Sequence, residues 1–218
     1  MPCPEFPFDR RQFLSSTTAF VTGIGLFALL PQVAWSKDDY INILGPRPGY
    51  APQIGTLVSM LTWMRTTVLH SVDGMSQIDL DRLFEATANT IGSLLLHLAA
   101  TEKYYQINTL EGKAWDSWPD SVTQKWTSPM SLGDAPRKTI KGNNLQYYLD
   151  ILNETREQSL TELRKRDDAW LMAVDQKWLW GLTNNYCKWF HVCEHESNHN
   201  GKIKFLAKRL PSAKPSNE

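Results

Sequence analysis

The chain has 218 residues, a length that favours one domain over two, and its 23 basic residues balance 23 acidic ones. Hydrophobic residues make up 42% of the sequence and charged residues 21%, a balance that is typical of globular proteins and excludes a largely disordered chain. Because phosphate binding needs an excess of positive charge on one surface, this neutral composition argues against a nucleic-acid partner.

Residues 1–36 have the features of an export leader. Residues 9–14 read Asp-Arg-Arg-Gln-Phe-Leu, which resembles a twin-arginine signal. A weakly apolar run follows, Pro31 ends it, and Ala-Trp-Ser at 34–36 offers the small residues that a signal peptidase reads. The alternative is an uncleaved membrane anchor, since the run is about long enough to span a bilayer. The cleavage-like site favours removal, so we expect a periplasmic bacterial protein that keeps no stable membrane insertion.

Residues 37–50 are polar and contain prolines and glycines, so we expect a linker there. A first helix is predicted from residue 51 to about 72, because apolar residues recur at helical spacing. A second helix is expected over about 89–106. Its apolar residues cover most of the circumference, which predicts a central position in the fold.

The segment 107–143 shows no clear period and contains tryptophans, prolines and glycines. We expect a long connection that is functional or contains short elements. A third helix is predicted over about 145–166. The stretch 169–180 has no helical period and is expected to be extended or to form a short turn. A fourth helix is predicted from about 185 to 209, before Pro211.

These helices, with no clear strand, predict an all-α fold. The expected architecture is a four-helix bundle over residues 51–210, with a long connection between its second and third helices. Residues 211–218 would form a tail. Metal sites in such bundles are built from inward-facing side chains on facing helices, so the histidines of the predicted helices are candidate ligands.

The histidines of the second and fourth predicted helices suggest a metal site. His97 lies in an apolar stretch, where an unpaired imidazole costs about 1 to 3 kcal/mol, and a backbone carbonyl or Glu102 is the simplest partner. His191, His195 and His199 follow one another at intervals of four residues, so their side chains stack on one helix face. We predict that His97, His195 and His199 bind one divalent metal and leave a coordination position open for water or substrate.

The residues from His195 to His199 also spell the HExxH motif of zinc peptidases, in which Glu196 would be the general base. The match is short, and the sequence after it lacks the extended metzincin pattern, so the bundle site is favoured. Glu194 and Glu196 are both candidates for a catalytic base. Each is explained equally well as a solvated charge on a helix.

Two segments together resemble the histidine motifs of the DinB-like superfamily, small metal-binding four-helix bundles. They are Thr-Ile-Gly-Ser-Leu-Leu-Leu-His-Leu-Ala-Ala-Thr-Glu at 90–102 and His-Val-Cys-Glu-His-Glu-Ser-Asn-His-Asn-Gly-Lys-Ile at 191–203. The resemblance implies a divalent metal, usually zinc or nickel, bound by His97, His195 and His199. His191 matches a less regular position of the motif, and Glu102 is expected to support the site rather than to bind the metal.

The resemblance also implies an activity. Members of the superfamily include transferases and isomerases that use low-molecular-weight thiols such as mycothiol or bacillithiol. Asn198 and Asn200 stand where the superfamily often has histidine and arginine, and an exported protein would not meet those cytosolic thiols. Two hypotheses therefore stand, a metal-dependent hydrolase or transferase acting on a small molecule and a non-catalytic module that binds metal or ligand. A homodimer is compatible with both.

Overall fold

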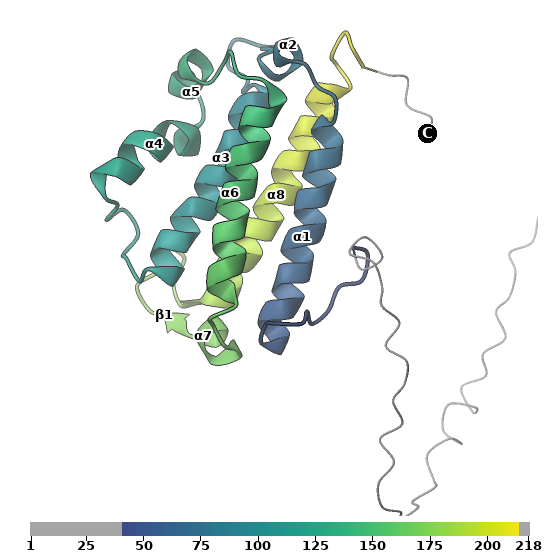
Figure 1. The fold of residues 1–218 in the computed structure, drawn as a ribbon. Coiled ribbons are helices and arrows are strands. Elements are labelled where there is room, and N and C mark those ends of the chain that lie inside the picture. The colour runs from purple at the N-terminus through teal and green to yellow at the C-terminus, as the bar shows by residue number, and fades with distance from the viewer. Residues whose placement is uncertain (1–40, 214–218) are drawn as a thin grey trace, which may run out of the picture. The chain divides into compact units, whose positions relative to one another are not determined.

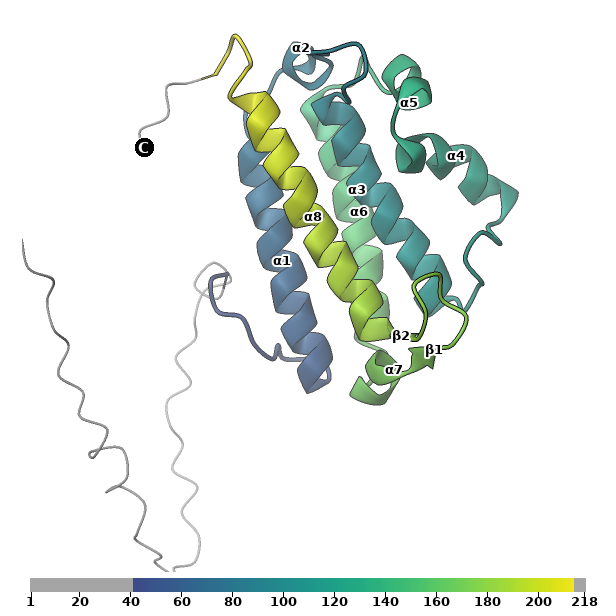
Figure 2. The same ribbon diagram turned by 180° about the vertical axis from the view of Figure 1, so that it is seen from behind.

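The computed structural model of this protein describes residues 41–213, in which four long helices lie side by side (Figure 1). The long helices are α1 (Pro52–Val72), α3 (Ile91–Tyr105), α6 (Leu145–Leu163) and α8 (Asn185–Ala207). α1 packs against α8, α3 packs against α6, and α3 also contacts α8. Figure 2 shows α8 from behind, between α1 and α3. The all-α bundle expected from the sequence is confirmed.

Polar residues define where α3, α6 and α8 begin. The side chains of Thr90, Asn144 and Asn184 each accept a hydrogen bond from the backbone N–H group three residues further on. Each bond satisfies a donor that the first turn of a helix leaves unpaired and contributes about 1 kcal/mol. α1 begins instead with Pro52, at a position where a helix needs no N–H group.

The connection between α3 and α6 contains helices of its own. α3 continues directly into the π-helical turn η1 (Gln106–Leu110), which α4 (Asp120–Ser131) and α5 (Asp134–Thr139) follow. α4 packs along the outer side of α3 (Figure 1). Only Trp126 and Pro129 of α4 are buried, so its sequence lacks the wide apolar stripe from which a helix is predicted.

Short elements close the ends of the bundle. The helix α2 (Gln77–Leu80) lies at one end, and α7 (Asp168–Met172) lies at the other. The strands β1 (Val174–Asp175) and β2 (Thr183–Asn184) form an antiparallel hairpin that leads into α8. The stretch 169–180 therefore contains both a helical turn and an extended segment.

The predicted leader lies outside the described residues. The described part of the predicted linker, 41–50, runs beside α1, where the backbone N–H of Gly45 donates to the hydroxyl of Ser59 at 3.1 Å. The backbone of Arg47 comes so close to Gly55 that a Cβ at Gly55 would meet the Arg47 nitrogen at 2.4 Å. Within residues 41–213, no helix has the length and apolar character needed to cross a membrane.

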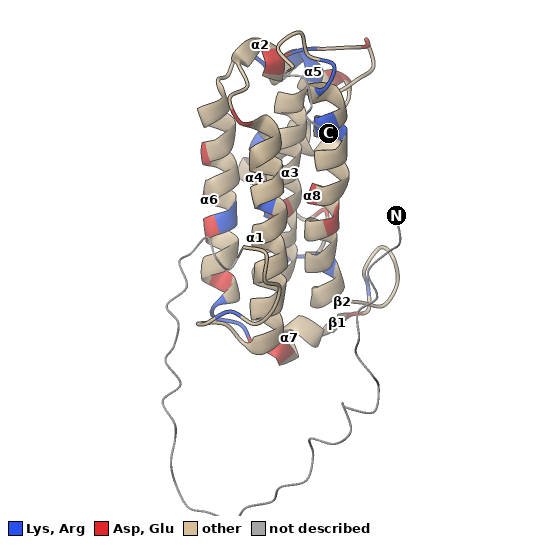
Figure 3. Cartoon of the chain, turned by 90° about the vertical axis from the view of Figure 1, so that its right-hand side faces the viewer, with Lys and Arg blue, Asp and Glu red and all other residues tan. Residues whose placement is uncertain are grey.

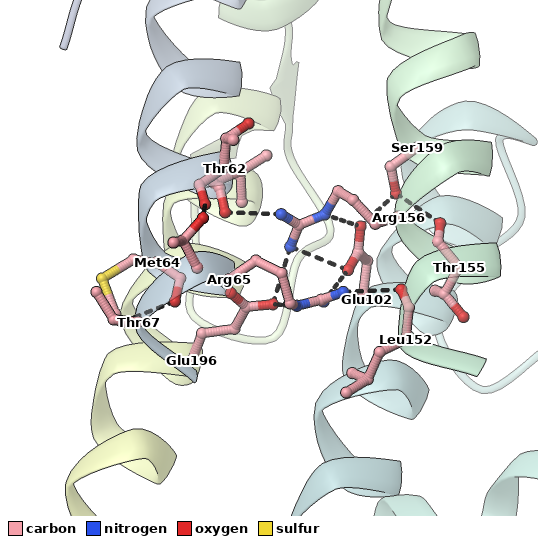
Figure 4. Close-up of polar contacts among 12 residues, drawn as sticks. Thr62, Met64, Arg65, Thr67, Glu102, Leu152, Thr155, Arg156, Ser159 and Glu196 are labelled. Atoms are coloured by element: carbon pink, nitrogen blue, oxygen red, sulfur yellow. Dashed lines mark hydrogen bonds and ion pairs between the residues drawn. The ribbon is translucent and has the colours of Figure 1, made fainter. Parts of the chain in front are cut away.

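Basic and acidic residues are interspersed along the helices, as the coloured cartoon of Figure 3 shows. Inside the bundle, by contrast, Arg65 of α1, Glu102 of α3, Arg156 of α6 and Glu196 of α8 are buried together (Figure 4). Glu102 accepts hydrogen bonds from Arg65 at 3.0 Å and from Arg156 at 2.8 Å. Oε1 of Glu196 accepts from the same two arginines at 2.5 and 2.8 Å. We call these four residues the charge cluster.

Backbone groups complete the charge cluster. The guanidinium of Arg65 also donates to the carbonyl of Leu152 at 2.7 Å, and that of Arg156 donates to the carbonyl of Leu61 at 2.7 Å. Burial by itself raises the pKa of Glu102, but the two guanidinium groups outweigh it and hold that pKa below its ordinary value. Each charge is therefore paired with opposite charge, as a buried charge must be, and among the described residues only Oε2 of Glu196 lacks a hydrogen-bond partner in the cluster.

The charge cluster lies between two apolar cores. On α1, Met64 belongs to one core and Val68 to the other, with Arg65 between them. On α8, Cys193 belongs to the same core as Met64 and Ile203 to the same core as Val68, with Glu196 between them. The cluster therefore sits at mid-height in the bundle, where each of the four long helices contributes one residue.

Replacing Arg156 by Met leaves Glu102 and Glu196 buried with Arg65 as their only cation. Because an uncompensated buried charge costs about 3–5 kcal/mol, we expect the free energy of unfolding to fall by about that amount. Chemical denaturation measures it. The matched control is Arg164→Met at the exposed end of the same helix, which should cost much less. Equal losses in the two variants would contradict the role of the cluster.

Candidate metal centre

Three histidines from two helices converge on one point. Nε2 of His195, on α8, lies 3.2 Å from Nε2 of His97, on α3, and 3.2 Å from Nε2 of His199, also on α8. The ligand atoms of the three residues all lie within 4.8 Å of one another. His97 and His199 are buried, and His195 is partly buried. The structure thus brings together the residues that the sequence selected as ligands, and we call them the histidine triad.

The long connection orients one member of the triad. Nδ1 of His97 lies 3.0 Å from the carbonyl oxygen of Pro129. Because a carbonyl only accepts, Nδ1 carries the proton and Nε2 keeps its lone pair for a metal. Pro129 lies in the last turn of α4, where carbonyls have no partner within the helix. Of the two partners considered for His97, a backbone carbonyl and Glu102, the structure has the carbonyl.

The positions of the nitrogen atoms fit a bound cation. Nε2 of His97 and Nε2 of His199 both face Nε2 of His195. A single proton shared among these atoms satisfies only one of the two contacts and leaves the other as a pair of facing lone pairs. A divalent metal accepts all three lone pairs at once, with bonds of about 2.0–2.1 Å in the case of zinc. Three imidazoles leave at least one coordination position for a nucleophile or substrate.

Burial lowers the pKa of each imidazole in the triad. The pKa of His195 falls to about 2 and that of His199 to about 3, mainly because burial disfavours the charged form and partly because of charge on neighbouring histidines. Burial also lowers the pKa of His97, although the hydrogen bond to Pro129 opposes this effect. The triad is therefore uncharged at neutral pH, the form in which histidine binds a metal.

His191 is next to the triad but does not belong to it. Its ring centroid is 5.5 Å from that of His195, and its Nδ1 lies 2.8 Å from the hydroxyl of Tyr105. Burial raises the pKa of Tyr105, so the phenol stays protonated and can donate this hydrogen bond. Trp180 packs edge-on against His191, with ring centroids 5.0 Å apart. Tyr105 and Trp180 belong to a larger group of contacting rings, which we call the aromatic wall. Its other members are Tyr104, Trp115, Trp118 and Trp178.

The three glutamates considered for this site lie outside the histidine triad. Glu196 directly follows His195, so its side chain leaves α8 about 100° further round the helix, on the side of α1 and α6. Both arginines of the charge cluster hold its Oε1, and among the described residues its Oε2 is buried without a hydrogen-bond partner, so the carboxylate is held by the arginines on that side of α8. Glu102 is 0% exposed in the same cluster. Glu194 is exposed, 4.0 Å from Nε2 of His191.

Sequence reasoning missed the two arginines of the charge cluster, although a signal was present. Arg65 and Arg156 each lie four residues after an apolar residue of a helical stripe, Leu61 and Leu152 respectively. A charged residue at such a position is expected to be buried and therefore paired. The role of the Pro129 carbonyl left no comparable signal, because every residue has a carbonyl.

Comparison with known proteins agrees with this geometry. A family model described as mycothiol-S-transferase matches residues 56–210. The match includes α3, α6 and α8 and nearly all of α1, and therefore the histidine triad and the charge cluster. No curated protein matches the chain.

The buried histidines make the stability of the metal-free protein depend on pH. The pKa values of His195 and His199 lie far below the ordinary value of 6.5, so the unfolded chain binds more protons than the folded chain as the pH falls below 6.5. Their contribution to stability is complete above that pH and decreases on acidification. The slope is at most about 1.4 kcal/mol per pH unit for each histidine.

Urea denaturation of the metal-free protein from about pH 7 to about pH 5 measures this effect. We expect the double variant His195→Gln with His199→Gln to lose less stability on acidification than the wild type. The exposed residue His70 provides the control, and His70→Gln should behave as the wild type does. An equal pH dependence in the wild type and the double variant would show that these imidazoles are not held neutral by the fold.

Proposed function

Because the chain belongs to the mycothiol-S-transferase family, a part of the DinB-like superfamily, we propose that it is a metal-dependent transferase that joins a low-molecular-weight thiol to a small molecule. The observation that carries this proposal is the convergence of three Nε2 atoms in the histidine triad. Within residues 41–213, no other group of three or more metal-binding side chains comes together in this way.

The triad has the properties that a metal-binding site requires. Burial keeps the three imidazoles neutral, and the carbonyl of Pro129 fixes the ring of His97 with its lone pair toward the other two. Zinc or nickel is the expected ion, and imidazole nitrogens suit both. A divalent metal bound there supplies Lewis acidity, which lowers the pKa of a thiol nucleophile toward neutrality.

His191 and Tyr105 are placed to assist substrate binding. With Tyr105 as the donor to Nδ1 of His191, the proton of the neutral imidazole is on Nε2, which lies 4.0 Å from the carboxylate of Glu194. We propose that this N–H group donates a hydrogen bond to a polar group of the substrate. Trp180 and the rest of the aromatic wall offer apolar surface for the substrate on the same side.

Metal analysis of the purified protein tests the premise of a metal site. The wild type is expected to bind one divalent ion per chain. His97→Ala, His195→Ala and His199→Ala should each weaken binding by more than about 100-fold, because loss of a group that only supports a ligand already costs up to that factor. The control His70→Ala, on the exposed side of α1, should retain the ion. Full metal content in the triad variants would refute the site.

The transfer reaction is tested with metal-loaded protein, a thiol and monobromobimane as the electrophile. Mycothiol and cysteine are compared, because an exported protein meets a different pool of thiols. Thiol consumption should require the bound metal. It is therefore expected in the wild type and in His70→Ala, and it should be lost in His195→Ala. Hydrolysis of ester substrates without any thiol would instead indicate a hydrolase. Metal binding with neither reaction would indicate a non-catalytic module.

We also propose that residues 1–36 direct export by the twin-arginine pathway. The support is Arg10 and Arg11, the apolar run after them and the Ala-Trp-Ser sequence at 34–36. In a bacterium that has this pathway, the full-length protein should appear in the periplasm without its leader. Replacing both arginines by Lys should keep it in the cytoplasm. Cell fractionation with mass spectrometry gives the readout, and a wild-type protein that stays cytoplasmic with its leader intact contradicts the proposal.

A further inference from the structure

A groove runs along α8 toward its C-terminal end. Its volume is about 460 Å³, within the usual range of small-molecule sites. Leu94 of α3 and Phe205 and Leu206 of α8 form an apolar lining. Asn198 and Lys202 of α8 provide polar groups in the same groove. The groove therefore combines apolar surface with a small number of polar contacts, as ligand sites do.

The groove is next to the histidine triad. Leu94 lies three residues before His97, and Lys202 lies three residues after His199, so each is about 4.5 Å along its helix from a triad member. At about 100° per residue, Lys202 also lies within about 60° of both α8 histidines around the helix axis. The same face of α8 therefore carries the histidines and one wall of the groove.

Lys202 is an uncompensated positive charge in this groove. Within residues 41–213 it has no carboxylate partner, whereas Arg209, which also lines the groove, pairs with Glu85 at 2.5 Å and stacks on Phe84 and Phe205. The charge of Lys202 contributes, after burial, to the lowered pKa of every member of the triad. An anion bound at Lys202 is therefore also close to the histidines.

A second cavity does not offer the same chemistry. It has a volume of about 250 Å³ and lies against the aromatic wall, with Trp115 and Met130 in its lining. Its charged residue is Asp116, and no basic residue lines it. An acidic molecule would therefore be repelled from this cavity, and the groove with Lys202 is the better site for one.

We infer that the groove binds the small-molecule substrate and that this substrate is a carboxylate with an apolar body. Lys202 binds the carboxylate, and Leu94 and Phe205 contact the apolar part. The carboxylate is then the end of the molecule nearest the triad, because Lys202 lies between His199 and Phe205 along α8. The assignment of this ligand as a substrate rests on the proposed transferase function, whereas the binding itself depends only on the groove.

The test measures binding of two arylalkanoates, phenylacetate and 3-phenylpropionate, and of their neutral amides by NMR titration of the isotope-labelled protein. In the wild type, the acids should bind about tenfold more tightly than the amides, with shift changes at Gly201, Lys202 and Phe205. Lys202→Gln should remove the advantage of the acids, and Lys202→Arg should retain most of it. Acids that bind no more tightly than amides, or shift changes remote from the groove, overturn the inference.

Matched variants separate the charge from the apolar contact. Lys204→Gln removes a charge from the opposite side of α8, so it should leave the binding of acids unchanged. Phe205→Ala should weaken acids and amides alike, whereas Phe190→Ala, at a similarly exposed position of α8, should weaken neither. If Lys202→Gln and Lys204→Gln weaken the acids equally, general surface charge explains the binding and the groove assignment is wrong.

Titration of both metal-free and zinc-loaded protein keeps this inference separate from the proposed function. Lys202→Gln should keep full metal content, because Lys202 is not a member of the triad. A wild type that binds no metal but distinguishes acids from amides through Lys202 supports the groove and refutes the proposed function. A wild type that binds metal but does not distinguish acids from amides supports the proposed function and refutes the groove assignment.

Discussion

The charge cluster is the interaction on which the arrangement of the bundle depends. Arg65, Glu102, Arg156 and Glu196 come from four different helices, and they have partners only when those helices stand in one register. Apolar packing alone tolerates small shifts along a helix, whereas a buried charge that loses its partner does not. Buried ion pairs contribute little net stability, so we regard the cluster mainly as a source of specificity for this packing.

The register set by the charge cluster also sets the histidine triad. His195 and Glu196 are neighbours in the sequence, so fixing the direction of Glu196 toward α1 and α6 fixes His195 on the side of α3, where it meets His97. One helix thus carries structural charge on one side and the imidazole nitrogens of the histidine triad on another. Within the segment that matches HExxH, Glu196 is bonded to the charge cluster, whereas His195 and His199 face the side of α3.

His191, His195 and His199 form a row along α8, and the surroundings at its two ends differ in chemistry. Beyond His191 the surroundings are aromatic, and the hydroxyl of Tyr105 is hydrogen-bonded to His191 there. Beyond His199 the groove is apolar with the positive charge of Lys202. A centre placed between two such environments can bind two reactants from different sides, which is what a transfer reaction between a nucleophile and a second small molecule requires.

The long helices and the row of histidines on α8 can be predicted from the sequence, because apolar periodicity and a four-residue spacing are local patterns. His97 is also recognisable in the sequence, because an imidazole in an apolar helix needs a partner. That this partner is the carbonyl of Pro129, and that Glu196 pairs with Arg65, 131 positions away, is visible only in the folded chain. Such choices depend on which surfaces meet in three dimensions, and no spacing along the chain records them.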